Sequence, residues 1–234
     1  MKAIAVLLAA AALAAATAAG GTAGSSWDGC TPRKGDVRFR AADGTRLVGH
    51  RFGSGRVAIV LAHESRGWLC EWTPFAKQLA ANGYLVFAFD FRGSGESQHG
   101  VRAPSRLDLD VAAATKSVRA LGAKKVFLVG ASLGGSAVIE AAAEIRPGVT
   151  GLVSVSGAAD LQNALPSAEK LQLPVLYLAG RLDTSFAEDA QRLYDATAST
   201  DKRILIVDRG EHGSRLVDAS PQVRRSIVSF VRAR

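Results

Sequence analysis

The sequence predicts an α/β protein with a mostly parallel sheet of about eight strands and helices on both faces. Short apolar runs alternate with longer helix-like segments along most of the 234-residue chain. Most of these runs are continuous, as in 57–62, which is typical of parallel strands covered on both sides. Strands that alternate with helices in this way form a parallel sheet with right-handed crossovers.

The first pair of strands is the exception to the parallel pattern. Residues 37–52 alternate apolar and polar side chains on either side of an Asp43-Gly44 pair, which predicts an antiparallel hairpin with its turn at that pair. Further strands are expected at 57–62, 84–89, 126–129, 149–155, 174–178 and 203–207.

Helices are expected between these strands and at the end of the chain. Gly83, Gly122 and Pro147-Gly148 close three of them, and Ser185 with Glu188 forms a capping box at the start of another. The expected helices are 71–82, 107–121, 133–145, 158–170, 186–198 and 221–232.

The start of the chain predicts a secretory signal peptide. Met1-Lys2 precedes an uncharged, Ala-rich stretch, and small residues suitable for cleavage follow it. We expect a signal peptide at 1–24 and a single domain at 25–234, with the mature protein secreted or periplasmic and not inserted in a membrane. An uncleaved anchor is the alternative. In a secreted chain the two cysteines, Cys30 and Cys70, predict one disulfide, with two free thiols as the alternative.

The net charge of +8 does not indicate a nucleic-acid partner. Pairs such as Lys124-Lys125 and Lys202-Arg203 lie at the starts of strands. Further positive charge is concentrated near the C-terminus, at Arg224, Arg225, Arg232 and Arg234. No basic run is interleaved with aromatic residues, as nucleic-acid binding would require. We interpret these charges as solvated strand ends and helix faces.

The sequence Gly130-Ala131-Ser132-Leu133-Gly134 has the form G-x-S-x-G. It follows an apolar run and precedes a helix-like run, which is the context of a nucleophile elbow. The sharp turn strains the backbone of the serine, and side chains at the flanking glycines would strike the neighbouring strand or helix. The serine also lies at a helix N-terminus, where free N–H groups favour negative charge.

A serine nucleophile needs an imidazole base and a carboxylate that orients it. His212 follows the last strand and is the only histidine after Ser132. Asp183 follows the strand at 174–178, which gives the chain order Ser, Asp, His. Asp160, after the strand at 149–155, is the alternative acid.

These residues give the chain a resemblance to the α/β-hydrolase superfamily over residues 37–234. The elbow, the ordered Ser132, Asp183 and His212, and the D-x-R-G-x-G-x-S stretch 90–97 carry it. The His63-Glu64 pair is similar to the dienelactone hydrolase group, although that group has a cysteine nucleophile followed by Leu-Gly-Gly. Ser132 here favours a serine esterase over dienelactone chemistry.

The oxyanion hole needs two N–H donors. Leu133 follows the nucleophile, and the resemblance implies Ser65 as the second donor. Glu64 beside a nucleophile would be unfavourable unless paired, and we expect Arg92 to pair with it. Trp68, Trp72 and Phe91 are candidates to line the site.

No cofactor or metal is expected. Gly93-Ser94-Gly95 lacks the third glycine of a dinucleotide fingerprint, since residue 98 is Gln, and no H-x-x-E or H-E-x-x-H spacing occurs. The segment between 157 and 174 leaves room for one short helix, so we expect no lid domain. The predicted function is hydrolysis of a small ester or of an ester at the end of a polymer. The alternatives are a peptidase or thioesterase with the same triad, and a non-catalytic binding protein.

Overall fold

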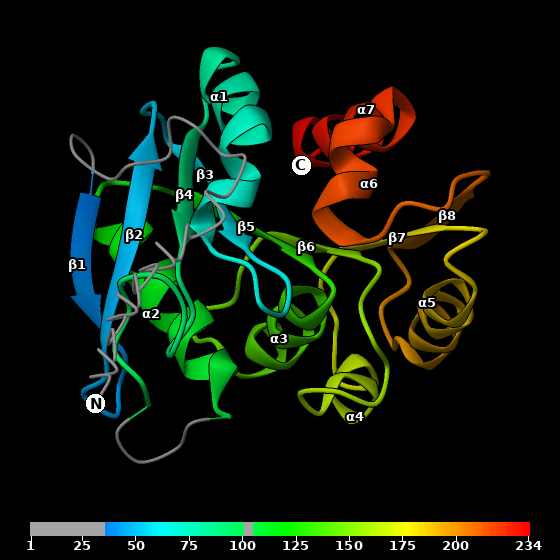
Figure 1. Ribbon diagram of the computed structural model, residues 1–234, viewed down its shortest axis with the longest axis horizontal. Coiled ribbons are helices and arrows are strands. Elements are labelled where there is room, and N and C mark those ends of the chain that lie inside the picture. Colours follow the sequence, from blue (N-terminus) through cyan, green and yellow to red (C-terminus); the bar gives the residue numbers. More distant parts are fainter. Residues whose placement is uncertain (1–35, 101–104) are drawn as a thin grey trace, which may run out of the picture.

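An eight-stranded sheet runs through the middle of the molecule in the order β1-β2-β4-β3-β5-β6-β7-β8 (Figure 1). This computed structural model describes residues 36–100 and 105–234. β1 and β2 form the predicted hairpin, β2 pairs antiparallel with β4, and the other neighbours are parallel. The strands are β1 (Asp36–Arg40), β2 (Arg46–Phe52), β3 (Val57–Ala62), β4 (Leu85–Phe89), β5 (Lys125–Ala131), β6 (Gly151–Val155), β7 (Val175–Gly180) and β8 (Lys202–Val207).

Helices cover both faces of the sheet, as predicted (Figure 1). One face packs against α2 (Leu107–Ala120), α3 (Leu133–Glu144), α4 (Ala164–Ala168) and α5 (Thr184–Ala196). The other face packs against η1 (Leu69–Trp72), α1 (Thr73–Ala81), α6 (Gly213–Ala219) and α7 (Pro221–Arg232). The all-buried patterns of β4, β6 and β7 follow from this double cover.

Local chemistry sets the bounds of the closing helix α7. Pro221 stands at its first position, and the Ser220 side chain accepts a hydrogen bond from the Val223 N–H. Val223, Ile227 and Phe230 are buried at helical spacing, so one face of α7 packs on the sheet. The predicted bounds of this helix are confirmed.

Three predictions about helices are wrong in detail. The helix expected at 71–82 is the 3₁₀ turn η1 followed by α1, and the one expected at 158–170 contains only the five-residue α4. The capping box at Ser185 is absent, because α5 begins earlier, with Asp183 as its N-cap. A short helix directly after His212, α6, was not predicted.

The parallel strands end at one edge of the sheet, where ligands bind in folds of this type. Loops that follow β3, β4, β5, β6, β7 and β8 all meet there. The predicted signal peptide and Cys30 lie outside the described residues, so cleavage and the disulfide stay predictions. In the two described ranges, no helix is both long and apolar enough to cross a membrane.

Candidate active site

Ser132 lies at a strained turn between β5 and α3. Its backbone has φ +50° and ψ −118°, a conformation that side-chain-bearing residues rarely adopt. A Cβ atom at Gly130 would overlap the Gly134 carbonyl, and one at Gly134 would overlap the Ala62 carbonyl at the end of β3. The glycines of the G-x-S-x-G sequence therefore let the turn close against both its own helix and the neighbouring strand.

His212 and Asp183 are joined by a hydrogen bond. The Nδ1 of His212 lies 2.7 Å from Oδ2 of Asp183, and the Phe186 ring packs on the imidazole with ring centroids 4.2 Å apart. When Nδ1–H donates to the carboxylate, Nε2 is left unprotonated and can accept a proton. Asp160, the alternative acid, is exposed and pairs with Arg192.

Residues 208–213, which follow β8 and carry His212, are called the histidine loop. Two hydrogen bonds attach the elbow and this loop to neighbouring residues at the end of β6. The Ser132 N–H donates to the Val155 carbonyl at 2.8 Å, and the Gly213 N–H donates to the Ser156 hydroxyl at 3.2 Å. A Cβ atom at Gly213 would lie 3.5 Å from the Ala131 side chain. Within the described ranges, no hydrogen bond joins Ser132 Oγ to His212. Such bonds often form only with substrate bound.

The loop that follows β3, residues 63–68, lies against the elbow; we call it the oxyanion loop. Buried His63 anchors it, because Nδ1–H donates to the Glu64 carbonyl at 2.8 Å and Nε2 accepts from the Phe91 N–H at 3.0 Å. Burial lowers the pKa of His63 to about 4, which keeps it neutral in this role. His63 is therefore a structural link between the ends of β3 and β4.

The oxyanion loop turns at Ser65, the predicted oxyanion donor. The Gly67 N–H donates to the Glu64 carbonyl at 3.0 Å, and Arg66 has φ +61°, as at the third position of a type II turn. Ser65 itself is exposed. Leu133 is the first residue of α3, so its N–H has no partner within the helix.

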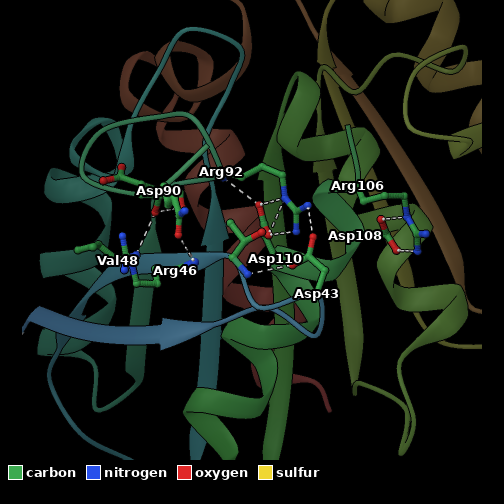
Figure 2. Close-up of polar contacts among 11 residues, drawn as sticks. Asp43, Arg46, Val48, Asp90, Arg92, Arg106, Asp108 and Asp110 are labelled. Atoms are coloured by element: carbon green, nitrogen blue, oxygen red, sulfur yellow. Dashed lines mark hydrogen bonds and ion pairs between the residues drawn. The ribbon is translucent and has the colours of Figure 1, made fainter. Parts of the chain in front are cut away.

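The expected pairing of Arg92 with Glu64 is wrong. Figure 2 shows Arg92 between Asp110 of α2 and Asp43 of the β1–β2 turn. The guanidinium contacts Asp110 at 2.6 Å and Asp43 at 2.8 Å, and the backbone N–H of Arg92 also donates to Asp110. The Arg92 and Asp110 side chains are fully buried, so two carboxylates compensate the arginine's charge. Arg92 fixes the hairpin to α2 and does not line the site.

Asp90, at the start of the same 90–97 stretch, also has a structural role (Figure 2). Its carboxylate accepts hydrogen bonds from the Leu69 N–H at 2.8 Å and the Glu96 N–H at 3.2 Å. The Ser97 hydroxyl donates to the Asp90 carbonyl and accepts from the Val48 N–H. These bonds fix the start of η1, which follows the oxyanion loop.

Glu64 instead points toward the histidine loop. Its Oε2 is buried without a hydrogen-bond partner among the described residues and lies against Gly213. Burial raises the pKa of Glu64, while charge on His212 and the Ser214 N–H act in the opposite direction.

A second carboxyl group, Glu71 in η1, lies beside Glu64 and was not singled out in the sequence. Its Oε1 accepts a hydrogen bond from the Glu64 N–H at 2.9 Å. Burial, followed by the neighbouring Glu64 carboxylate, raises the pKa of Glu71 to about 8. In the sequence, Glu71 stands three residues after Trp68. This spacing is common in ordinary helices, so it does not indicate a functional residue.

A pocket of about 290 Å³ opens beside these acids. Its wall is formed by the oxyanion loop, including Trp68, and by Glu71, Ser214 and Arg215. Trp68 thus lines a cavity next to the candidate site. Trp72 and Phe91 do not, because both are buried in the core with exposed fractions of 1% and 2%. Among the described residues, no group of three or more His, Cys, Asp or Glu side chains could hold a metal ion.

Comparisons with known proteins agree with this architecture. The model of the Hydrolase_4 family, described as serine aminopeptidase, S33, matches residues 54–167. The protein has the α/β-hydrolase fold. The esterase Pf2001 of Pyrococcus furiosus superposes with a TM-score of 0.75 at 18% identity, covering 85% of this chain and 91% of the esterase.

Two curated relatives are similar in sequence. Uncharacterized protein YfhR of Escherichia coli (strain K12) is 26% identical, over 83% of this chain and 79% of its own. A 2-hydroxy-6-oxononadienedioate/2-hydroxy-6-oxononatrienedioate hydrolase of Burkholderia vietnamiensis is 33% identical over 49% of this chain and 42% of its own. Together the matches support a serine-type hydrolase of the α/β-hydrolase fold. They do not extend to the finer resemblance to dienelactone hydrolases.

The Arg92 cluster predicts a large effect of Asp110 on stability. Asp110→Ala removes the fully buried carboxylate that pairs with a fully buried guanidinium, so we expect a loss of about 3–5 kcal/mol of unfolding free energy. Urea denaturation followed by circular dichroism measures it. Asp160→Ala removes an exposed partner of Arg192 and serves as the control, with little expected change. Equal losses in the two variants would contradict the assigned role of Arg92.

Glu71 predicts a pH dependence of stability. Its pKa is about 8 in the folded protein against an ordinary value of 4.5, so between these pH values the folded state retains a proton that the unfolded state loses. Its contribution to stability is therefore complete below about pH 4.5 and is lost as the pH rises through about 8. We expect Glu71→Gln to flatten this decline in urea denaturation from about pH 5 to about pH 9. A Glu71→Gln curve parallel to that of the wild type would contradict the assignment.

Proposed function

We propose that this protein is a serine hydrolase of carboxylic esters that acts through Ser132, His212 and Asp183 and forms an acyl-enzyme. The observation that carries the proposal is the 2.7 Å hydrogen bond between His212 and Asp183, together with the strained elbow at Ser132. Strain of this kind persists where the surrounding structure enforces it, and it is common at reactive positions. The three residues stand at the carboxyl edge of the sheet, after β5, β7 and β8.

The first half of the reaction forms the acyl-enzyme. His212 Nε2 takes the proton from Ser132 Oγ while Oγ bonds to the ester carbonyl carbon, and Asp183 stabilises the resulting imidazolium. The carbonyl oxygen becomes an oxyanion that accepts hydrogen bonds from the N–H groups of Leu133 and Ser65. The bond to the alcohol oxygen then breaks, and the alcohol leaves with the proton from His212.

The second half repeats these steps with water. His212 removes a proton from water as the water oxygen attacks the acyl carbon, and the same two N–H groups hold the oxyanion. Collapse of this intermediate releases the carboxylic acid and returns the proton to Ser132 Oγ. No cofactor takes part in this scheme.

The surroundings of the triad favour small acyl groups or one end of a polymer. The segment between β6 and β7 contains only α4, so the structured part of this segment is a single short helix. Exposed Leu161 and Leu182 stand in the loops after β6 and β7, with exposed fractions of 47% and 70%. Two exposed apolar side chains in these loops suit contact with a short acyl chain.

Peptide hydrolysis is the second candidate, because the matching family description is a serine aminopeptidase. The same triad chemistry cleaves amides and thioesters as well as esters. The choice between these substrates depends on how well the site accepts an alcohol, a thiol or an amine as the leaving group.

Export completes the proposal. We expect removal of residues 1–24, a secreted or periplasmic mature protein and a Cys30–Cys70 disulfide. Intact-mass measurement of the protein recovered outside the cytoplasm tests both: the mass should lack the signal peptide and be two hydrogens below that of the reduced chain.

Substitutions of the triad give a graded test. Ser132→Ala should abolish both ester hydrolysis and labelling by a fluorophosphonate probe, and Asp183→Asn should lower kcat about 10³- to 10⁴-fold because His212 loses its orienting partner. Asp160→Asn is the matched control and should retain wild-type kcat. Labelling that persists in Ser132→Ala would mean that Ser132 is not the nucleophile, and a wild-type protein that takes no label would favour a non-catalytic binding protein.

A substrate panel tests the proposed class. Initial rates are compared for p-nitrophenyl esters from two to twelve acyl carbons, the corresponding thioesters and aminoacyl p-nitroanilides. We expect the highest kcat/KM with the shortest acyl esters, because the exposed leucines Leu161 and Leu182 offer a long acyl chain little apolar surface. A preference for the anilides by more than about tenfold would select the peptidase alternative.

A further inference from the structure

The carboxyl group of Glu71 contacts both ends of the turn that carries Ser65. Its Oε1 accepts the Glu64 N–H at 2.9 Å, and its Oε2 packs so closely on Gly67 that a Cβ atom there would overlap it. Glu64 and Gly67 are the first and last residues of this turn, joined by their own 3.0 Å hydrogen bond. Glu71 itself is almost fully buried, with an exposed fraction of 7%.

Glu64 links Glu71 to the segment that carries His212. Its backbone is held by Glu71, and its carboxyl group packs on Gly213, the residue after His212. The chain of contacts therefore runs from η1 through the oxyanion loop to the start of α6. A shift of the Glu71 side chain would move the Ser65 N–H and the support of His212 together.

We propose that Glu71 is a positioning residue of this site, whose carboxyl group holds the oxyanion loop so that the Ser65 N–H faces the carbonyl oxygen of an ester bound at Ser132. The proposal rests on the hydrolase function proposed above and adds a residue to it. Glu71 acts through Ser65 and Glu64 and does not itself contact the reacting atoms.

The charges around Glu71 make this positioning sensitive to pH. Glu64 of the oxyanion loop and Asp218 of α6 raise the pKa of Glu71, and Arg215 of α6 lowers it, with burial as the largest cause of a value of about 8. Ionisation of Glu71 places a second negative charge against Glu64 where little water can screen it. The repulsion loosens the turn, so the oxyanion hole weakens as the pH rises through about 8.

Two substitutions separate the hydrogen bond from the charge. Glu71→Leu removes the acceptor for the Glu64 N–H, and we expect kcat to fall about 10- to 100-fold with little change in KM, because an oxyanion hole acts mainly on the transition state. Glu71→Gln keeps an acceptor oxygen and does not ionise. It should keep a higher kcat at pH 7 than Glu71→Leu does, and it should lose the alkaline decline of kcat near pH 8.

A neighbouring charge provides a directional check. Asp218 raises the pKa of Glu71, so Asp218→Asn should move the alkaline decline to lower pH. Glu169→Gln, at an exposed position that follows α4, is the matched control and should leave the pH profile unchanged. Glu71→Leu with wild-type kcat, or Glu71→Gln with the wild-type alkaline decline, would overturn the proposal.

A measurement without substrate distinguishes this proposal from the proposed function. Trp68 and Trp72 flank Glu71 in the chain, so tryptophan fluorescence of the intact protein should change near pH 8 in the wild type and not in Glu71→Gln. If this change is present but no ester, thioester or anilide is hydrolysed, the hydrolase function fails while the coupling of Glu71 to the loop stands. If the protein is active and the fluorescence change is the same in both, the inference about Glu71 is wrong. Should Glu71→Leu not fold, the Glu71→Gln and Asp218→Asn profiles still decide.

Discussion

The carbonyl oxygens at the end of β3 lie so close to the start of α3 that only glycine fits at position 134. A side chain there would overlap Ala62 and stand 2.5 Å from the His63 carbonyl oxygen. This contact places the N-terminus of α3, with Ser132 and Leu133, directly beside the oxyanion loop. This placement requires the strained positive φ of Ser132. The packing of β5 and α3 on either side of the turn maintains that backbone conformation.

Buried polar groups fix the positions of the loops around this contact. Neutral His63 joins the end of β3 to Phe91, Asp90 fixes the start of η1, and Arg92 joins the hairpin to α2. Each group has its hydrogen bonds satisfied, as stable burial of polar atoms requires. The Oε2 of Glu64 is an exception among the described residues, and it lies where the oxyanion loop meets the histidine loop. In the scaffold, Trp72 Nε1, Thr115 Oγ1 and Ser154 Oγ are also buried without a partner among these residues.

The sequence predicted the strands, the hairpin and most helices because their hydrophobic periodicity and their glycine and proline boundaries are local properties. It also ordered Ser132, Asp183 and His212 along one edge, since strand ends in a parallel sheet share that edge. It could not predict the partner of Arg92, because Asp110 and Asp43 approach only through tertiary packing. For the same reason the sequence did not indicate a role for Glu71. The raised pKa of Glu71 comes from burial and from the nearby Glu64, and hydrophobic periodicity reveals neither.

The central claim is that three loops form one oxyanion-binding, nucleophilic site at Ser132. A crystal structure of the protein after reaction with an alkyl fluorophosphonate tests it most directly, because the phosphonyl oxygen stands where the oxyanion of an ester would be. The account predicts phosphorus bonded to Ser132 Oγ, with that oxygen about 3 Å from the N–H groups of both Leu133 and Ser65 and His212 Nε2 near the adduct. A phosphonyl group on another residue, or an oxygen turned away from Ser65 toward solvent, would contradict it.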